Sequence, residues 1–261
     1  MKRPSRLEYI YSVGRVRALE KFLIQRAVFE EAAEMPDHSA ALKLIFDAGR
    51  FPEALVKAGD STELDSVLSG EEERLKREMT ELILEKKVLE VFLFAGEPER
   101  ALAAAAASRY PFLQDHIRRR IDLGNIKIFL RSRYQGLSPD RLQGRLLDGG
   151  FIPSKQFVIR LSLASVEIGE IKDSSPYREL WAKGVTGLSE RETFIPLERG
   201  IEDFLMNDLR KARQIVFGPE PVFAFGQAKR REIALVRLVG IGKLNSVPSG
   251  LLQERISETY V

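Results

Sequence analysis

Apolar residues recur every three or four positions through most of this chain, which is the spacing that buries one face of an α-helix. The clearest case is the segment 197–216, whose charged residues fall away from one apolar line on a helical wheel. That line is Leu197, Ile201, Phe204, Leu205, Leu209, Ala212 and Val216. Segment 71–94 has the same spacing, and so has an N-terminal segment marked by Val16, Leu19, Leu23 and Ala27. The sequence therefore predicts an all-α fold.

Glycine and proline clusters divide the chain into pieces of helical length. They lie at Pro36, 49–52, 96–98, 136–139, 149–153, 174–176, 184–187, 218–221 and Pro248. Residues 216–238 begin with one of these breaks and are expected to continue as a single helix. Only 156–165 alternates apolar and polar residues as a strand would, and the same residues are equally compatible with a helix.

The composition excludes several classes of function. The chain has 261 residues and no cysteine, so disulfides, thiolate metal ligands and thiol chemistry are absent. Its 41 basic and 38 acidic side chains give a net charge of only +3, which does not favour nucleic acid as a partner. The N-terminus lacks the apolar core of a signal peptide, and the most apolar windows, 88–96 and 233–242, are too short to span a bilayer. We expect a cytoplasmic protein that meets a membrane only through a partner.

No group of residues predicts catalysis, a metal site or a cofactor. His38 and His116 each lack a second histidine at a metal-ligand spacing. The GIGK sequence at 240–243 lacks the leading glycine and the final Ser or Thr of a phosphate-binding loop. The glycines of DGGF (148–151) and GVTG (184–187) are interpreted as helix-ending turns.

The chain contains an internal similarity with a period of 110 residues. Segments beginning at Gly14, Gly124 and Ala234 superpose so that Val16, Ile126 and Val236 match, as do Arg17, Lys127 and Arg237. We therefore expect a helical repeat at 1–116, a second at 117–226 and a completing helical segment at 227–261. In this register Asp122 corresponds to Glu232.

Glu232 falls on the apolar line of its expected helix, together with Ala228, Leu235, Val236 and Val239. An unpaired buried carboxylate is costly, so a partner from elsewhere is required if the position is buried. We hypothesise that Glu232 and Asp122 tie neighbouring helix layers together, with Arg15, Arg17, Arg119 and Arg120 as candidate partners. The alternative is that Glu232 lies at the solvated edge of the apolar line.

Several segments resemble the C subunit of the V/A-type (vacuolar/archaeal-type) rotary ATPases and ATP synthases, which is related to the d subunit of the eukaryotic vacuolar enzyme. The C-terminal part carries LERGIEDFLMNDLRKARQ (197–214), a Pro-containing break, a helix with Lys-x-x-Glu and then Arg, a Gly-Lys turn and a closing Glu-Arg-Ile. The middle part, IDLGNIKIFLRSRYQGLSPDRL (121–142) followed by LLDGGFI (146–152), is similar to the family's Asp-x-x-Asn helix and Gly-Gly turn. YIYSVGRVRALEKFLI (9–24) is similar to its N-terminal motif.

The resemblance implies an all-helical, funnel-like and non-catalytic subunit of the rotor. Such a subunit is peripheral on the cytoplasmic face of the membrane, sits on the proteolipid ring and receives the foot of the rotor shaft, formed by subunits of the D and F type. It couples ion transport to ATP synthesis or hydrolysis and needs no cofactor or metal. The family-matched positions, interpreted as interface residues or structural ties, are Arg15, Arg17, Asp122, Asn125, Lys127, Glu232 and Arg237.

The chain departs from the family pattern in the number of repeats. The family has three, with the Asp-x-x-Asn helix twice internally, whereas this sequence has one such helix, at Asp122 to Asn125, and Leu235 stands where the family often has Asn. We therefore expect one repeat fewer than three, which leaves a slimmed family member, a divergent paralogue, or a homo-oligomer that completes the socket. Two other classes stay open: a helical-repeat scaffold for an unrelated protein, and an enzyme with an unfamiliar site.

Overall fold

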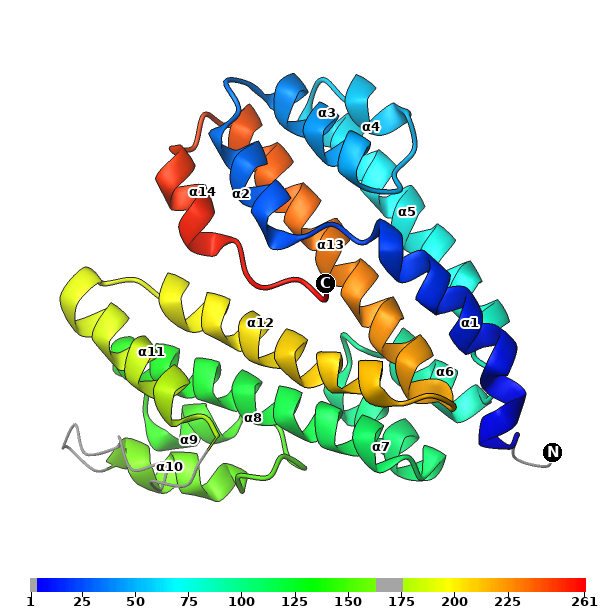
Figure 1. Ribbon diagram of the computed structural model, residues 1–261. Coiled ribbons are helices and arrows are strands. Elements are labelled where there is room, and N and C mark those ends of the chain that lie inside the picture. The colour runs from blue at the N-terminus through cyan, green and yellow to red at the C-terminus, as the bar shows by residue number, and fades with distance from the viewer. Residues whose placement is uncertain (1–3, 163–175) are drawn as a thin grey trace. The chain divides into compact units, whose positions relative to one another are not determined.

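Every regular element of the described chain is a helix. The computed structural model describes residues 4–162 and 176–261, and no strand occurs within them (Figure 1). The prediction of an all-α fold is confirmed for these residues. No described helix combines the length with the apolar composition that crossing a bilayer requires.

The chain forms two compact units. Unit 1 consists of Met1–Leu93 and Met206–Val261, and unit 2 of Phe94–Leu205. The repeat boundaries expected from the sequence, 1–116, 117–226 and 227–261, concern internal similarity rather than compactness. They stay a prediction.

Unit 1 is built around one long helix, α13 (Pro219–Leu244), which packs against α1, α2, α3, α5 and α6. From Pro219 to Lys229 every residue of α13 is buried, which is typical of a helix surrounded by others. Figure 1 shows α13 running alongside α5 and α1. The other elements of unit 1 are η1 (Arg6–Tyr9), α1 (Ile10–Leu19), η2 (Glu20–Phe22), α2 (Arg26–Glu34), α3 (His38–Ala48), α4 (Ala54–Lys57), α5 (Ser61–Leu82), α6 (Lys86–Leu93), η4 (Lys211–Gln214) and α14 (Ser249–Arg255).

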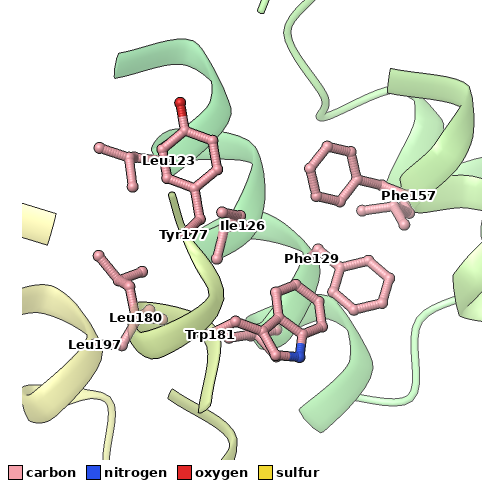
Figure 2. Packing of buried hydrophobic residues seen from close by; sticks show 10 residues of the cluster. Leu123, Ile126, Phe129, Phe157, Tyr177, Leu180, Trp181 and Leu197 are labelled. Atoms are coloured by element: carbon pink, nitrogen blue, oxygen red, sulfur yellow. The ribbon is translucent and has the colours of Figure 1, made fainter. Parts of the chain in front are cut away.

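Unit 2 is organised by α8 (Pro111–Tyr134), which packs against α7, α9, α10 and α11. Its core contains Phe129 of α8, Phe157 of α10, and Tyr177 and Trp181 at the start of α11, with the rings of Phe129 and Trp181 5.4 Å apart (Figure 2). The remaining elements are α7 (Pro98–Ser108), α9 (Pro139–Gln143), α10 (Ser154–Ser162) and α11 (Arg178–Arg191). Helix α12 (Ile195–Arg210) begins in unit 2 and contains the boundary with unit 1.

Local sequence signals explain where many helices begin. Proline occupies the start of α7, α8, α9 and α13, where its missing N–H is not needed. Asp37 caps α3 by accepting the amide of Ala40, and Asp60 caps α5 by accepting the amides of Thr62 and Glu63. These caps satisfy amides that have no partner within the helix.

Several helix boundaries differ from the sequence expectation. The expected helix over 71–94 is broken between α5 and α6, and the N-terminal line through Leu23 and Ala27 crosses the end of η2. The alternating stretch at 156–165 is helical in α10 up to Ser162, and its remaining residues lie outside the described chain. Residues 197–216 form most of α12 followed by η4.

Two glycine motifs expected to be turns lie inside helices. Gly184 and Gly187 are within α11, and the GIGK residues 240–243 are within α13. A Cβ on Gly184 would lie 2.9 Å from the side chain of Leu130, and one on Gly240 would lie 2.6 Å from Leu64. These glycines therefore allow close helix packing, and GIGK offers no loop to hold a phosphate.

The same C-terminal turn closes α8 and α13, at positions 110 residues apart. After α8 the amides of Gln135, Gly136 and Leu137 donate to the carbonyls of Arg131, Arg133 and Ser132. After α13 the amides of Asn245, Ser246 and Val247 donate to the carbonyls of Ile241, Lys243 and Gly242. Gly136 and Ser246 both have positive φ, 64° and 52°. The two helices thus end in the register that the sequence similarity predicts.

Candidate functional site

Asp122 lies at the centre of a hydrogen-bonded cluster in unit 2. Its side chain is fully buried and accepts the amides of Phe151 (3.1 Å) and Ile152 (2.9 Å) and the hydroxyl of Tyr177 (2.9 Å). A Cβ on Gly150 would come within 2.1 Å of one carboxylate oxygen, so only glycine fits above it. Burial raises the pKa of Asp122, against the lowering effect of these three donors. The carboxylate fastens the Gly-Gly turn and the start of α11 to α8.

Asn125 extends this cluster by one helical turn. Its side-chain oxygen accepts the amide of Leu147 (2.9 Å) and its side-chain nitrogen donates to the carbonyl of the same residue (2.8 Å). Asp122 and Asn125 lie on one side of α8 because residues three apart are neighbours on a helix. The Asp-x-x-Asn spacing therefore binds the backbone of 147–152 along α8.

Glu232 is the corresponding residue of unit 1, and it is also buried. One carboxylate oxygen accepts the amide of Ile24 at 2.7 Å, and the other is bonded to Nζ of Lys229. Nζ of Lys229 also lies 4.1 Å from the centre of the Phe51 ring, which attracts a cation. Burial raises the pKa of Glu232, whereas Lys229 and the Ile24 amide lower it. The carboxylate joins α13 to the segment between η2 and α2.

The cation beside Glu232 differs from the sequence expectation of an arginine partner. Lys229 reaches it from one turn earlier on the same helix, a spacing that the sequence already displays. Arg17 instead pairs with Glu20 and donates to the carbonyls of Ala212, Arg213 and Ile215. Arg120 donates to the carbonyl of Ala95 at 2.9 Å.

Asp122 is stabilised mainly by hydrogen-bond donors. Arg119, which the sequence suggested as a possible partner, forms an ion pair with Asp115, with the two charged groups 3.9 Å apart. Tyr177 was missed as a partner because it lies 55 residues further along the chain, where no local signal points to it.

Two other family-matched residues, Lys127 and Arg237, also join neighbouring elements. Lys127 of α8 pairs with Glu198 of α12 at 3.3 Å. Arg237 of α13 pairs with Asp65 (2.9 Å) and Glu72 (3.4 Å) of α5. The seven sequence-predicted residues therefore do not converge on one site. Among the described side chains, moreover, no group of three or more Asp, Glu or His residues could hold a metal ion.

An exposed apolar surface lies on η1, α1 and the segment before α13. It consists of Leu7, Ile10 and Tyr11, which are 59%, 56% and 76% exposed, and of Val216 and Phe217. Arg6 connects the two segments by donating to the carbonyl of Phe217 and pairing with Glu220. We call this group the α1 surface. Contiguous exposed apolar side chains are typical of contact sites.

Two cations, Arg15 of α1 and Lys21 of η2, lie on the same N-terminal segment as the α1 surface. Arg15 and Lys21 are exposed, and neither makes an ion pair or a side-chain hydrogen bond with any residue of the described chain. Arg15 follows Tyr11 by one helical turn, so the two side chains share a face. A partner with apolar residues and carboxylates would match this arrangement.

Comparison with known proteins identifies the family. Residues 37–255 match the family model described as ATP synthase (C/AC39) subunit. The chain is 28% identical over 151 residues to the C subunit of the V-type sodium ATPase of Enterococcus hirae, a match covering 58% of this chain and 45% of that protein. It is 25% identical over 158 residues to the C subunit of the V-type ATP synthase of Thermus thermophilus, covering 60% and 46%.

A third match covers a similar share of this chain and a smaller share of the relative. The C subunit of the A-type ATP synthase of Methanosphaera stadtmanae is 22% identical over 149 residues, covering 55% of this chain and 38% of that protein. The chain thus spans less than half the length of each of these relatives. The resemblance seen in the sequence is confirmed, and the chain belongs to the ATP synthase (C/AC39) subunit family.

Proposed function

We propose that this chain is a non-catalytic rotor subunit of a V/A-type ATPase or ATP synthase. It acts as a socket or spacer between the rotor shaft, of the D and F type, and the proteolipid ring. It transmits torque between ion movement and ATP chemistry, and it is peripheral on the cytoplasmic face, where it contacts the membrane only through the ring. Membership of the C/AC39 family is the observation that carries this proposal.

The use of the buried polar side chains supports a mechanical role. Asp122, Asn125 and Glu232 are each bonded to backbone groups of another segment, so their polar atoms serve cohesion. A spacer that transmits torque needs stiff packing and contact surfaces rather than a reactive site. We further propose that the shared turns after α8 and α13 belong to repeated helical modules, with one repeat fewer than three.

The α1 surface is the proposed contact with the rotor shaft. A coiled coil offers helices that can lie along α1, and carboxylates on those helices would face Arg15 and Lys21. The variant Tyr11→Glu places a charge in the centre of this surface. Ile159→Glu is the matched control, because Ile159 is also an exposed apolar residue (62%) but lies on α10 in unit 2.

The test uses the complex reconstituted in vesicles with and without this chain. We expect ATP hydrolysis to continue without the chain while ATP-driven ion uptake is lost, because the rotor shaft is then no longer connected to the proteolipid ring. Tyr11→Glu should lower ion uptake and binding to the shaft, whereas Ile159→Glu should leave both unchanged. If the purified chain binds neither the shaft nor the ring at low salt, the rotor proposal is wrong. A helical-repeat scaffold for another protein is then the better explanation.

A further inference from the structure

A pocket of about 300 Å³ lies between α8 and α11 of unit 2. Leu130, Arg133 and Tyr134 line it from α8, and Trp181, Val185, Leu188 and Ser189 line it from α11. We call it the α8–α11 pocket. Its volume is at the lower end of the range for ligand sites, so it suits a small ligand or part of a larger one.

Two donors of this pocket that are buried or partly buried have no partner in the described chain. The Nε1–H of Trp181 is buried and makes no hydrogen bond, although a buried indole N–H usually finds an acceptor. The guanidinium of Arg133 is partly buried and makes no ion pair or hydrogen bond with any described residue, whereas its neighbour Arg131 pairs with Glu198. Both groups are donors, and one carries a positive charge.

The rest of the lining is mostly apolar, and the hydroxyl-bearing Tyr134 is 57% exposed, so water can reach its hydroxyl. Leu130, Val185 and Leu188 form the apolar wall, and the hydroxyl of Ser189 donates to the carbonyl of Thr186. No residue of the lining carries a carboxylate. The pocket therefore combines an apolar wall with unsatisfied donors and no competing acid.

We propose that the α8–α11 pocket binds a small anionic amphiphile. Its apolar body packs against Leu130, Val185 and Leu188, and its anionic head pairs with Arg133, with an acceptor atom for Nε1 of Trp181. The proposal stands on unit 2 alone and is independent of the proposed rotor function. The chemistry is that of an alkyl or acyl chain with an anionic head, whose source is either a free fatty acid or a lipid surface.

Trp181 provides a direct readout, because it is the only tryptophan in the 261-residue sequence. The full chain is titrated with octanoate while the tryptophan emission is recorded. We expect a saturable shift of the emission with octanoate, binding of octylamine at least roughly tenfold weaker, and no shift with inorganic phosphate. No saturable shift with octanoate, or equal binding of octylamine, would overturn the proposal.

Arg133→Gln tests the anionic head, and Arg141→Gln is its matched control. Arg141 is an exposed arginine of α9 that does not line the pocket, so its loss changes the net charge equally. Arg133→Gln should weaken octanoate binding about 10- to 100-fold, the loss typical of a charge-assisted hydrogen bond, while Arg141→Gln leaves it unchanged. Equal effects of the two variants would contradict a head group at Arg133.

Lipid vesicles distinguish a free fatty acid from a lipid surface as the source of the anionic amphiphile. A shift of the Trp181 emission with phosphatidylglycerol vesicles but not with phosphatidylcholine vesicles indicates a lipid surface as the source. A shift with octanoate alone indicates a free amphiphile. Far-UV circular dichroism of each variant confirms that the helices are retained.

Discussion

Replacing Glu232 by alanine should lower the free energy of unfolding by about 3–5 kcal/mol, the usual result of removing one partner of a buried ion pair. The substitution leaves the buried Nζ of Lys229 without its carboxylate and removes the acceptor of the Ile24 amide. An unsatisfied buried amide alone costs about 1–3 kcal/mol. The two losses are not additive, because Lys229 can move toward solvent once the pair is broken. The expected loss is a large part of the about 5–15 kcal/mol that stabilises a domain.

Urea unfolding followed by far-UV circular dichroism measures this loss. The matched control is Glu73→Ala, which breaks a solvent-exposed ion pair with Lys76 on α5 and should have only a small effect on the free energy of unfolding. The double variant Lys229→Met/Glu232→Leu replaces the buried pair by apolar side chains and should recover part of the stability, because the Ile24 amide still lacks its acceptor. If Glu232→Ala costs no more than Glu73→Ala, the reasoning that Glu232 is a buried tie is refuted.

The remaining predictions concern unit 2 and one helix of unit 1. Asp122→Asn should lower the free energy of unfolding by about 1–3 kcal/mol, because the amide nitrogen that replaces one oxygen cannot accept a backbone N–H. Burial raises the pKa of Asp122 in the folded chain. The folded side chain therefore keeps its proton at pH values above 3.8, the ordinary pKa of an aspartate, where the unfolded chain has released it. The stability of the parent relative to Asp122→Asn should therefore fall as the pH rises above 3.8 through the pKa of the folded chain. Urea midpoints measured over a series of pH values test this. A stability difference that grows with pH would contradict a raised pKa at Asp122. Gly150→Ala should destabilise by more than about 2 kcal/mol in thermal unfolding because its Cβ would meet Asp122, whereas Gly14→Ala, with open space around it, should stabilise by about 0.5–1 kcal/mol.

The helical periodicity predicted the fold class because burying one face of a helix is a local requirement that the sequence displays directly. Proline and glycine at 218–221 likewise predicted the start of α13, since proline fits only the first turn of a helix. The break after η2 was not predictable. The apolar spacing continues through Leu23 and Ala27, but the amide of Ile24 bonds to Glu232, a residue 208 positions away, instead of continuing a helix.

The candidate site was predictable to a similar extent. The 110-residue similarity pairs Asp122 with Glu232, and the structure buries both acids on long helices. Lys229 was within reach of sequence reasoning, since it lies three residues before Glu232. The glycines at 184 and 187 were misinterpreted because a turn and a close contact inside a fold both favour the absence of a side chain. Only the packing of Leu130 against Gly184, and of Thr193 and Pro196 against Gly187, distinguishes them.

The order of the segments in the two units has a consequence for synthesis. Unit 2 is a single continuous stretch, and the bonds of Asp122 reach only as far along the chain as Tyr177. Unit 1 needs its last 56 residues, Met206–Val261, before Glu232 can meet Ile24. During synthesis all residues of unit 2 are therefore made before unit 1 is complete. Until α13 has been made, the N-terminal helices of unit 1 leave apolar surface uncovered. During that interval the uncovered apolar surface makes the nascent chain most prone to aggregation.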